Sequence, residues 1–249
     1  MTSVNSKKLV LVTAGNRGIG AAIVKQLVDE GYAVVFTYNK GKEDAENLTK
    51  HLNKDEETCW NYPCDVGKLE QVKLLSQRVF DKHGIPYAIV NNAGIVKDNF
   101  LLNMHPDEWS DVINVNLNSL FFITHFFLNE MLGSGDGCIV NMSSITGIRG
   151  NAGQANYAAA KAGQIGFIKS LAKEVGVFNF RVNCIAPGLV GTDMISSMPE
   201  KLINNFVKAT PLRKMTQPEE IADMVAFLLG KGGKNITGQV MVIDGGLSI

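Results

Sequence analysis

The sequence lacks an excess of charge of either sign. Its 249 residues include 24 Lys and Arg and 24 Asp and Glu, and only five of the cations are Arg. Proteins that bind nucleic acid or anionic membranes through surface charge usually carry a basic excess. We therefore expect no nucleic-acid partner and no membrane partner. Hydrophobic residues make up 45% and charged residues 19% of the chain, which is typical of a folded globular protein.

Cysteine is scarce and is not arranged for metal binding. The four cysteines, at positions 59, 64, 138 and 184, form no C-x-x-C pair, and no His lies at ligand spacing beside them. A chain of this size without a secretory leader is not expected to depend on disulfides. We expect free thiols and no metal site.

Long hydrophobic runs are absent as well. Residues 1–8 are polar and do not resemble a signal peptide. The most apolar stretch, 117–132, is interrupted by Asn, Thr, His and Glu and is too short to span a bilayer. These features predict a cytoplasmic protein.

Short apolar, β-branched runs alternate with segments of helical period. The runs are 9–13, 33–37, 58–63, 87–91, 138–142, 181–185 and 240–243, and the helices expected between them are 19–30, 41–53, 67–83, 107–133, 155–175 and 217–229. Such alternation predicts βαβ units and a parallel sheet covered by helices on both faces. We predict an α/β fold, a single doubly wound Rossmann-like domain over residues 1–249 with a seven-stranded parallel sheet. The segment 187–212 is long and irregular for a connection, so we expect it to form a substrate lid.

A glycine-rich turn follows the first expected strand. Gly15, Gly18 and Gly20 stand in the spacing G-x-x-G-x-G between that strand and a helix. Glycines there let the backbone approach a pyrophosphate, and the helix N-terminus offers free N–H groups and the positive end of a dipole. Because glycine turns also join strands to helices for structural reasons, the turn alone does not establish cofactor binding.

The end of the second expected strand bears on the choice between NAD and NADP. A carboxylate usually holds the 2′-hydroxyl of NAD at this place, whereas the 2′-phosphate of NADP attracts cations. Here the strand is followed by Asn39 and Lys40 without an acid, and Arg17 lies in the first turn. We therefore expect NADP(H), although Lys40 would equally suit a solvated loop.

Three polar residues form a candidate catalytic set. Ser144 follows an expected strand, and Tyr157 and Lys161 are four residues apart, on one face of the next helix. A phenol has a pKa near 10, and a neighbouring ammonium group lowers it. Tyr157 would then exchange a proton with a carbonyl oxygen that Ser144 orients. A Tyr and a Lys at this spacing also occur on ordinary solvated helices, so the set depends on its combination with the glycine turn.

These features together resemble the short-chain dehydrogenase/reductase family over residues 7–249. The resemblance rests on the glycine turn, Cys64-Asp65-Val66, Asn91-Asn92-Ala93-Gly94, Val115-Asn116-Leu117, Ser144, Tyr157 with Lys161, and Pro187-Gly188. It implies a catalytic tetrad of Asn116, Ser144, Tyr157 and Lys161, in which Asn116 holds a water through its helix backbone and passes protons to Lys161.

The resemblance also implies the cofactor contacts. Asp65 would meet the adenine, Asn91 and the Ala93-Gly94 backbone would line the ribose, and Thr192 would contact the carboxamide. The residues expected to contact NADP(H) are Gly15, Asn16, Arg17, Gly18, Ile19, Gly20, Asn39, Lys40, Asp65, Val66, Asn91, Ala93, Gly94, Tyr157, Lys161, Pro187, Gly188, Val190 and Thr192.

The chain departs from the family's pattern in its first turn. The family usually has T-G-x-x-x-G-x-G, whereas here Ala14 and Gly15 stand in the reverse order. If Ala14 adopts a positive φ, the strain costs about 1 kcal/mol or somewhat more. The departure leaves the pyrophosphate contacts open.

Within the family, the sequence is most similar to reductases of 3-oxoacyl thioesters. Such enzymes reduce the β-keto group of a substrate linked to acyl carrier protein or to CoA, in fatty-acid or polyketide-like biosynthesis. The substrate residues implied are Ser144, Gln154, Asn156 and Tyr157. The assembly implied is a homotetramer, a dimer of dimers. In it the expected helix 107–133 would contribute apolar contacts through its phenylalanines, some of which must also be core: Phe121, Phe122, Phe126 and Phe127.

The identity of the carrier stays open at this stage. The connections 133–137 and 175–180 contain no cation, so electrostatic steering of an acidic carrier protein would be weak. Lys97, Arg149 and Arg213 are the alternative contacts. A reductase of another ketone or secondary alcohol, or a catalytically idle subunit of a hetero-oligomer, are the alternative functions.

Overall fold

A computed structural model of the chain describes residues 7–54, 56–192 and 199–249. Seven parallel strands form one sheet in the order β3-β2-β1-β4-β5-β6-β7. The strands are β1 (Leu9–Val12), β2 (Ala33–Tyr38), β3 (Cys59–Pro63), β4 (Ala88–Asn91), β5 (Gly137–Met142), β6 (Phe180–Pro187) and β7 (Val240–Ile243). The strand order reverses between β1 and β4, which is where a doubly wound sheet binds its ligand.

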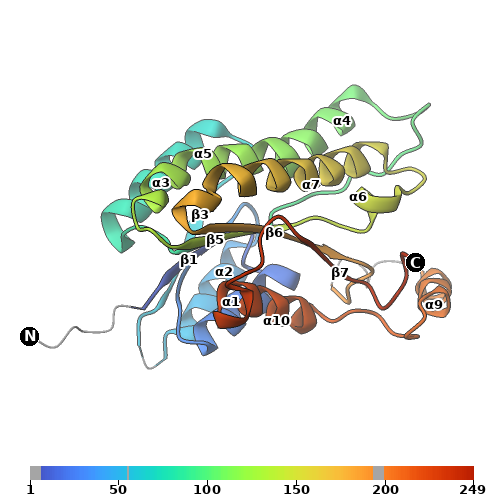
Figure 1. Cartoon of the computed structure of the whole chain (residues 1–249). Coiled ribbons are helices and arrows are strands. Elements are labelled where there is room, and N and C mark those ends of the chain that lie inside the picture. The colour runs from blue at the N-terminus through green and yellow to red at the C-terminus, as the bar shows by residue number, and fades with distance from the viewer. Residues whose placement is uncertain (1–6, 55, 193–198) are drawn as a thin grey trace, which may run out of the picture.

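Helices cover both faces of the sheet (Figure 1). The longer helices are α1 (Gly18–Asp29), α2 (Lys42–Leu52), α3 (Leu69–His83), α4 (Pro106–Ile113), α5 (Ser119–Leu132), α7 (Ala155–Val175), α9 (Glu200–Ala209) and α10 (Pro218–Leu229). Helices α1, α2 and α10 lie on one face, and α3, α5 and α7 lie on the other. The predicted fold class is confirmed.

Alternating residues of each strand supply two separate cores. In β1, Val10 and Val12 pack on the α1 and α10 side, whereas Leu9 and Leu11 pack on the α3, α5 and α7 side. Successive side chains of a strand point to opposite faces. The strands are therefore apolar throughout, as expected for a sheet covered twice.

The structure differs from the expected elements in three places. The single helix expected over 107–133 is interrupted by a π-helical turn, Asn114–Asn118, between α4 and α5. The segment 187–212, expected to be irregular, contains α9, and a short helix α6 (Thr146–Arg149) follows β5. Residues 193–198 of the expected lid lie outside the described residues. Helix α9 has no fully buried residue, but Leu202, Ile203, Phe206 and Val207 recur at helical spacing, and the prediction overlooked this signal.

Candidate functional site

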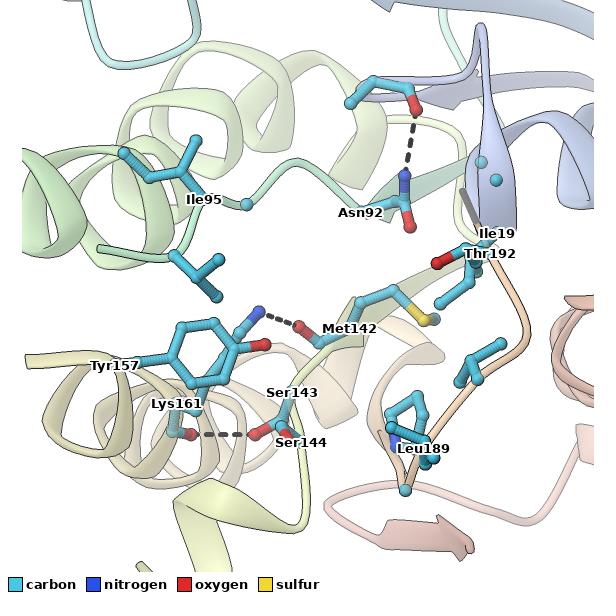
Figure 2. Close-up of a pocket in the computed structure, with 18 of the residues that line it drawn as sticks. Ile19, Asn92, Ile95, Met142, Ser143, Ser144, Tyr157, Lys161, Leu189 and Thr192 are labelled. Carbon is cyan, nitrogen blue, oxygen red and sulfur yellow. Dashed lines mark hydrogen bonds between the residues drawn. The ribbon is translucent and has the colours of Figure 1, made fainter. Parts of the chain in front are cut away.

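A cavity of about 510 Å³ lies over the carboxyl ends of the central strands (Figure 2). It combines the first turn, the loop after β4, the loop after β5, the start of α7 and the segment after β6. Its lining comprises Ala14, Arg17, Gly18, Ile19, Gly20, Asn92, Gly94, Ile95, Val96, Met142, Ser143, Ser144, Tyr157, Lys161, Pro187, Gly188, Leu189, Val190 and Thr192. Two sets of predicted residues, the glycine turn and the catalytic set, therefore meet in one cavity.

The N-terminus of α1 faces this cavity. The helix begins at Gly18 after Arg17, and no side chain caps it and no acidic residue stands in its first turn. The first N–H groups of a helix have no partner within the helix, and the helix dipole adds positive potential there. The arrangement suits an anionic group such as a phosphate.

The reversed Ala14–Gly15 order has a clear structural result. Ala14 takes the left-handed conformation, with φ 52°, and Gly15 does not. A Cβ atom on Gly15 would lie 2.5 Å from Cβ of Phe36 in β2, so glycine is needed there for packing. A Cβ on Gly20 would lie 2.1 Å from the carbonyl oxygen of Ala14. The turn thus keeps its shape, at the cost of one strained alanine.

Thr13 and Asn92 fasten the first turn to the loop after β4. The Thr13 hydroxyl oxygen accepts from the backbone N–H groups of Asn92 and Ala93, both at 2.9 Å. The Asn92 amide donates to the carbonyl oxygens of Thr13 and Ala14 at 3.1 and 3.0 Å. Neither residue was among the predicted contacts. The Asn91-Asn92 pair after a buried strand was the available signal, and only the register of β1 and β4 shows which Asn faces the turn.

The first turn is also tied to the end of β2. The Asn16 amide donates to the carbonyl oxygens of Lys40 and Gly41 at 2.9 and 3.2 Å. Arg17, Asn39 and Lys40 are exposed, and neither cation forms an ion pair with a residue that the structure describes. Two unpaired cations thus belong to two segments that Asn16 holds together.

Eight predicted cofactor residues do not line the cavity: Gly15, Asn16, Asn39 and Lys40, described above, and Asp65, Val66, Asn91 and Ala93. Asp65 is half-buried and accepts from the Gly67 N–H at 3.1 Å, and Val66 packs in the core beneath α3 and α5. The Asn91 amide donates to the Asn141 side chain at 2.9 Å, and both are buried. Ala93 is half-buried behind the first turn. On the other side, Pro187, Gly188, Val190 and Thr192 do line the cavity.

Tyr157 and Ser144 are neighbours on the catalytic side (Figure 2). Burial raises the pKa of Tyr157 to about 12, while its hydrogen bond with Ser144 acts to lower it. The structure corrects our expectation that Lys161 brings this pKa below its ordinary value. The Tyr157 phenol therefore holds its proton at neutral pH and can serve as a proton donor.

Lys161 is buried beside Tyr157. Its ammonium group donates to the carbonyl oxygen of Met142 at 2.5 Å and lies 5.5 Å from the centre of the Tyr157 ring. No carboxylate is paired with it among the described residues. Burial lowers the pKa of Lys161 to about 8, because the charged form loses hydration without gaining a counter-ion.

Asn116 occupies the π-helical turn between α4 and α5. Its side chain accepts from the Ile95 N–H at 2.8 Å and donates to the Ile95 carbonyl oxygen at 2.9 Å. A Cβ on Gly94 would lie 3.2 Å from Oδ1 of Asn116 and 3.6 Å from Nζ of Lys161. The tetrad residues Asn116 and Lys161 therefore converge on Gly94, and π turns are frequent at functional sites.

The two predicted substrate residues before Tyr157 have different places. Asn156 is fully buried and donates to the carbonyl oxygens of Lys97 and Glu108, at 2.9 and 3.2 Å. Because its amide is used inside the protein, Asn156 supports the loop after β4 and does not face a substrate. Gln154 is half-buried and donates to Asp98 at 2.9 Å.

Among the described residues, no group of three or more His, Cys, Asp and Glu is arranged to hold a metal ion. None of the helices described is both long and apolar enough to cross a bilayer.

Comparison with known proteins identifies relatives along the whole chain. Residues 13–248 match the family described as enoyl-(acyl carrier protein) reductase. The chain is 41% identical over 251 residues, covering 100% of both sequences, to the 3-oxoacyl-[acyl-carrier-protein] reductase FabG of Chlamydia trachomatis. It is 38% identical over 240 residues, 96% of this chain and 98% of the relative, to the protein of the same name from Staphylococcus epidermidis.

Proposed function

The chain belongs to the short-chain dehydrogenase/reductase family and is an oxidoreductase, and we propose that it reduces the β-keto group of a 3-oxoacyl thioester with NADPH. One observation carries the proposal. Ser144, Tyr157 and Lys161 line the same cavity as the uncapped N-terminus of α1. A proton donor and an anion-binding turn are thereby joined in one site. The relatives named as 3-oxoacyl-[acyl-carrier-protein] reductases support the choice of substrate.

The site fits a nicotinamide dinucleotide phosphate. Gly20 keeps the first turn compact, since a Cβ there would collide with the backbone of Ala14, and the uncapped N-terminus of α1 would meet the pyrophosphate. Arg17 and Lys40 would hold the 2′-phosphate, and the segment Pro187–Thr192 would face the nicotinamide end. When bound, NADPH supplies a hydride to the keto carbon.

The residues of the chain supply the proton and orient the ketone. Tyr157 keeps its phenol proton because burial raises its pKa to about 12, so it donates to the keto oxygen as negative charge develops there. Ser144 donates a hydrogen bond to the same oxygen and fixes its direction. The Lys161 ammonium favours the tyrosinate left behind, and Asn116 holds the Gly94–Ile95 wall opposite.

The proposal includes thioesters of both CoA and acyl carrier protein. The cations considered as carrier contacts are engaged inside the chain. Lys97 pairs with Asp111 at 2.6 Å, Arg149 donates to the Leu247 carbonyl oxygen at 2.9 Å, and Arg213 donates to that of Lys208. All three bonds lie at the surface, where an acidic carrier protein would compete with weak exposed contacts.

We also propose a homotetramer as the working assembly. Trp109 of α4 is 40% exposed and Phe121 of α5 is 51% exposed, on adjacent helices of one face. Phe127, considered for the same surface, is fully buried and packs on Phe80 with ring centres 5.2 Å apart. The apolar surface for a partner is therefore narrower than the phenylalanine spacing indicates.

The oxidation of NADPH with acetoacetyl-CoA tests the function, with NADH and the variant Tyr157→Phe alongside. We expect turnover with NADPH, a lower kcat/KM with NADH, and loss of turnover in the variant. The variant should still bind NADPH, because it lacks one hydroxyl only. Tight binding of NADPH by the wild type without turnover of CoA-linked or carrier-linked thioesters would refute the proposal and favour the idle-subunit alternative.

A further inference from the structure

Helix α7 carries a buried glutamine one turn beyond Lys161. Gln164 is 2% exposed, and its amide nitrogen donates to the backbone carbonyl oxygen of Asn116 at 2.5 Å. Its Oε1 atom is buried without a hydrogen-bond partner among the described residues. A buried amide satisfied on one side only costs about 1–3 kcal/mol. Such a residue in the middle of an apolar helix face requires an explanation.

The π turn beside Gln164 has altered hydrogen bonding. The backbone N–H of Ser119 donates to Asn114 five residues earlier, so the usual helical pairing is shifted. The Ser119 hydroxyl then donates to the Val115 carbonyl oxygen at 2.5 Å. The next carbonyl, that of Asn116, takes its hydrogen from Gln164 on another helix. The turn is therefore completed by side chains and not by helical backbone bonds alone.

Helix α7 is shaped to receive this turn closely. A Cβ on Gly163 would lie 3.0 Å from Cδ2 of Leu117. Position 163 therefore has little space for any side chain larger than the hydrogen of glycine. Gly163 provides the close approach, and Gln164 provides the hydrogen bond beside it. Two successive residues of α7 thus fix the position of the π turn.

The position of the turn decides the position of the cavity wall. The Asn116 side chain makes two hydrogen bonds to Ile95, and Gly94 lies between Asn116 and Lys161. Gly94 and Ile95 both line the cavity. A shift of the turn would therefore move this wall relative to Lys161 and Tyr157.

We propose that Gln164 is a positioning residue, which fixes Asn116 and the Gly94–Ile95 wall against the catalytic face of α7 by donating to the Asn116 carbonyl. This inference rests on the proposed reductase function for its kinetic readout. Gln164 itself contacts none of the reacting atoms. Its contribution is the geometry of groups that do.

Two substitutions separate the donor from the shape of the side chain. Gln164→Met keeps a similar unbranched shape without a donor, and we expect kcat to fall by about 10- to 100-fold at every pH, with KM for the thioester within about threefold. Gln164→Glu has a donor only when its carboxyl is protonated. We expect its kcat to approach the wild-type value at low pH and to fall with rising pH in a one-proton step.

Matched substitutions at Gln26 test whether the effects are specific to position 164. Gln26→Met and Gln26→Glu change a glutamine of α1 whose side chain meets only Glu30, at 3.5 Å, and should leave kcat and its pH profile unchanged. Circular dichroism at each pH shows that the variants stay folded. If Gln164→Met fails to fold, the pH dependence of kcat in Gln164→Glu tests the proposal instead. That measurement compares the protonated and ionised forms of one variant.

The proposal is overturned if Gln164→Met keeps kcat within twofold of wild type. It is also overturned if the profile of Gln164→Glu runs parallel to the wild-type profile. Absence of turnover in the wild type would instead refute the reductase function. In that case the dissociation constant of NADPH is compared between the wild type, the Gln164 variants and the Gln26 controls, because the Gly94–Ile95 wall should influence it.

Discussion

The two ends of the cavity are built by different means. At the first turn the surface is backbone, shaped by glycines at positions 15, 18 and 20 and by an uncapped helix N-terminus. At the catalytic end the surface includes two polar side chains, the half-buried Tyr157 and the buried Lys161, and Asn116 supports the wall from behind. Substitutions that add atoms should disturb the end built from backbone. Substitutions that remove a charge or a hydrogen bond should disturb the end built from polar side chains.

Removing the charge at the catalytic end should have the largest effect, with opposite signs for activity and stability. We expect Lys161→Met to lower kcat by at least about 100-fold, a magnitude typical of lost proton-transfer chemistry. A pKa lowered from 10.5 to about 8 means that folding with the buried ammonium costs roughly 3 kcal/mol at neutral pH. The variant should therefore be more stable by about 1–3 kcal/mol in urea unfolding at pH 7.

The pH dependence of stability checks the origin of this gain. Below about pH 8 Lys161 carries its proton in both states, so the cost is fully present. Between about 8 and 10.5 only the unfolded chain keeps the proton, and the free energy of unfolding rises with pH. The Met variant should lack this rise. A variant less stable than wild type would show that the hydrogen bond to Met142 outweighs desolvation.

An added methyl group at the first turn should affect cofactor binding before catalysis. In Gly20→Ala the new Cβ would lie 2.1 Å from the Ala14 carbonyl oxygen, so the turn must move, at a cost of about 1–3 kcal/mol. We expect the dissociation constant of NADPH, measured by fluorescence titration, to rise by about tenfold or more. Gly166→Ala on α7, where a Cβ would meet nothing within 4 Å, is the control. Equal affinity in both variants would refute a backbone-built site.

The smallest expected effect concerns the reversed pair at the start of the turn. Ala14 has φ 52°, so Ala14→Gly should relieve strain and raise the free energy of unfolding by about 0.5–1 kcal/mol, after the larger entropy of the unfolded glycine is offset. Gly15→Ala should instead destabilise the protein, because its Cβ would lie 2.5 Å from Phe36. Thermal unfolding of both variants measures the two changes in stability. Stabilisation by Gly15→Ala would contradict the assignment of strain to Ala14.

Much of the architecture follows from local patterns. Apolar β-branched runs and helical periods predicted all seven strands, and the expected helix 155–175 agrees with α7. The glycine turn and the set of Ser144, Tyr157 and Lys161 were predicted together, and the cavity brings them together. Helix α9 was missed because the whole segment 187–212 was interpreted as irregular, although the apolar residues of α9 recur at helical spacing.

The sequence by itself determined the order of the elements and the spacing of Tyr157 and Lys161, because periodicity and helical geometry act over a few residues. Only the tertiary structure decided which polar groups are buried and what they meet. Asn116 and Gln164 are 48 positions apart, Asn156 turns inward to Lys97 and Glu108, and burial moves the pKa of Tyr157 upward. Desolvation and hydrogen bonding between distant segments depend on packing, which local sequence patterns do not specify.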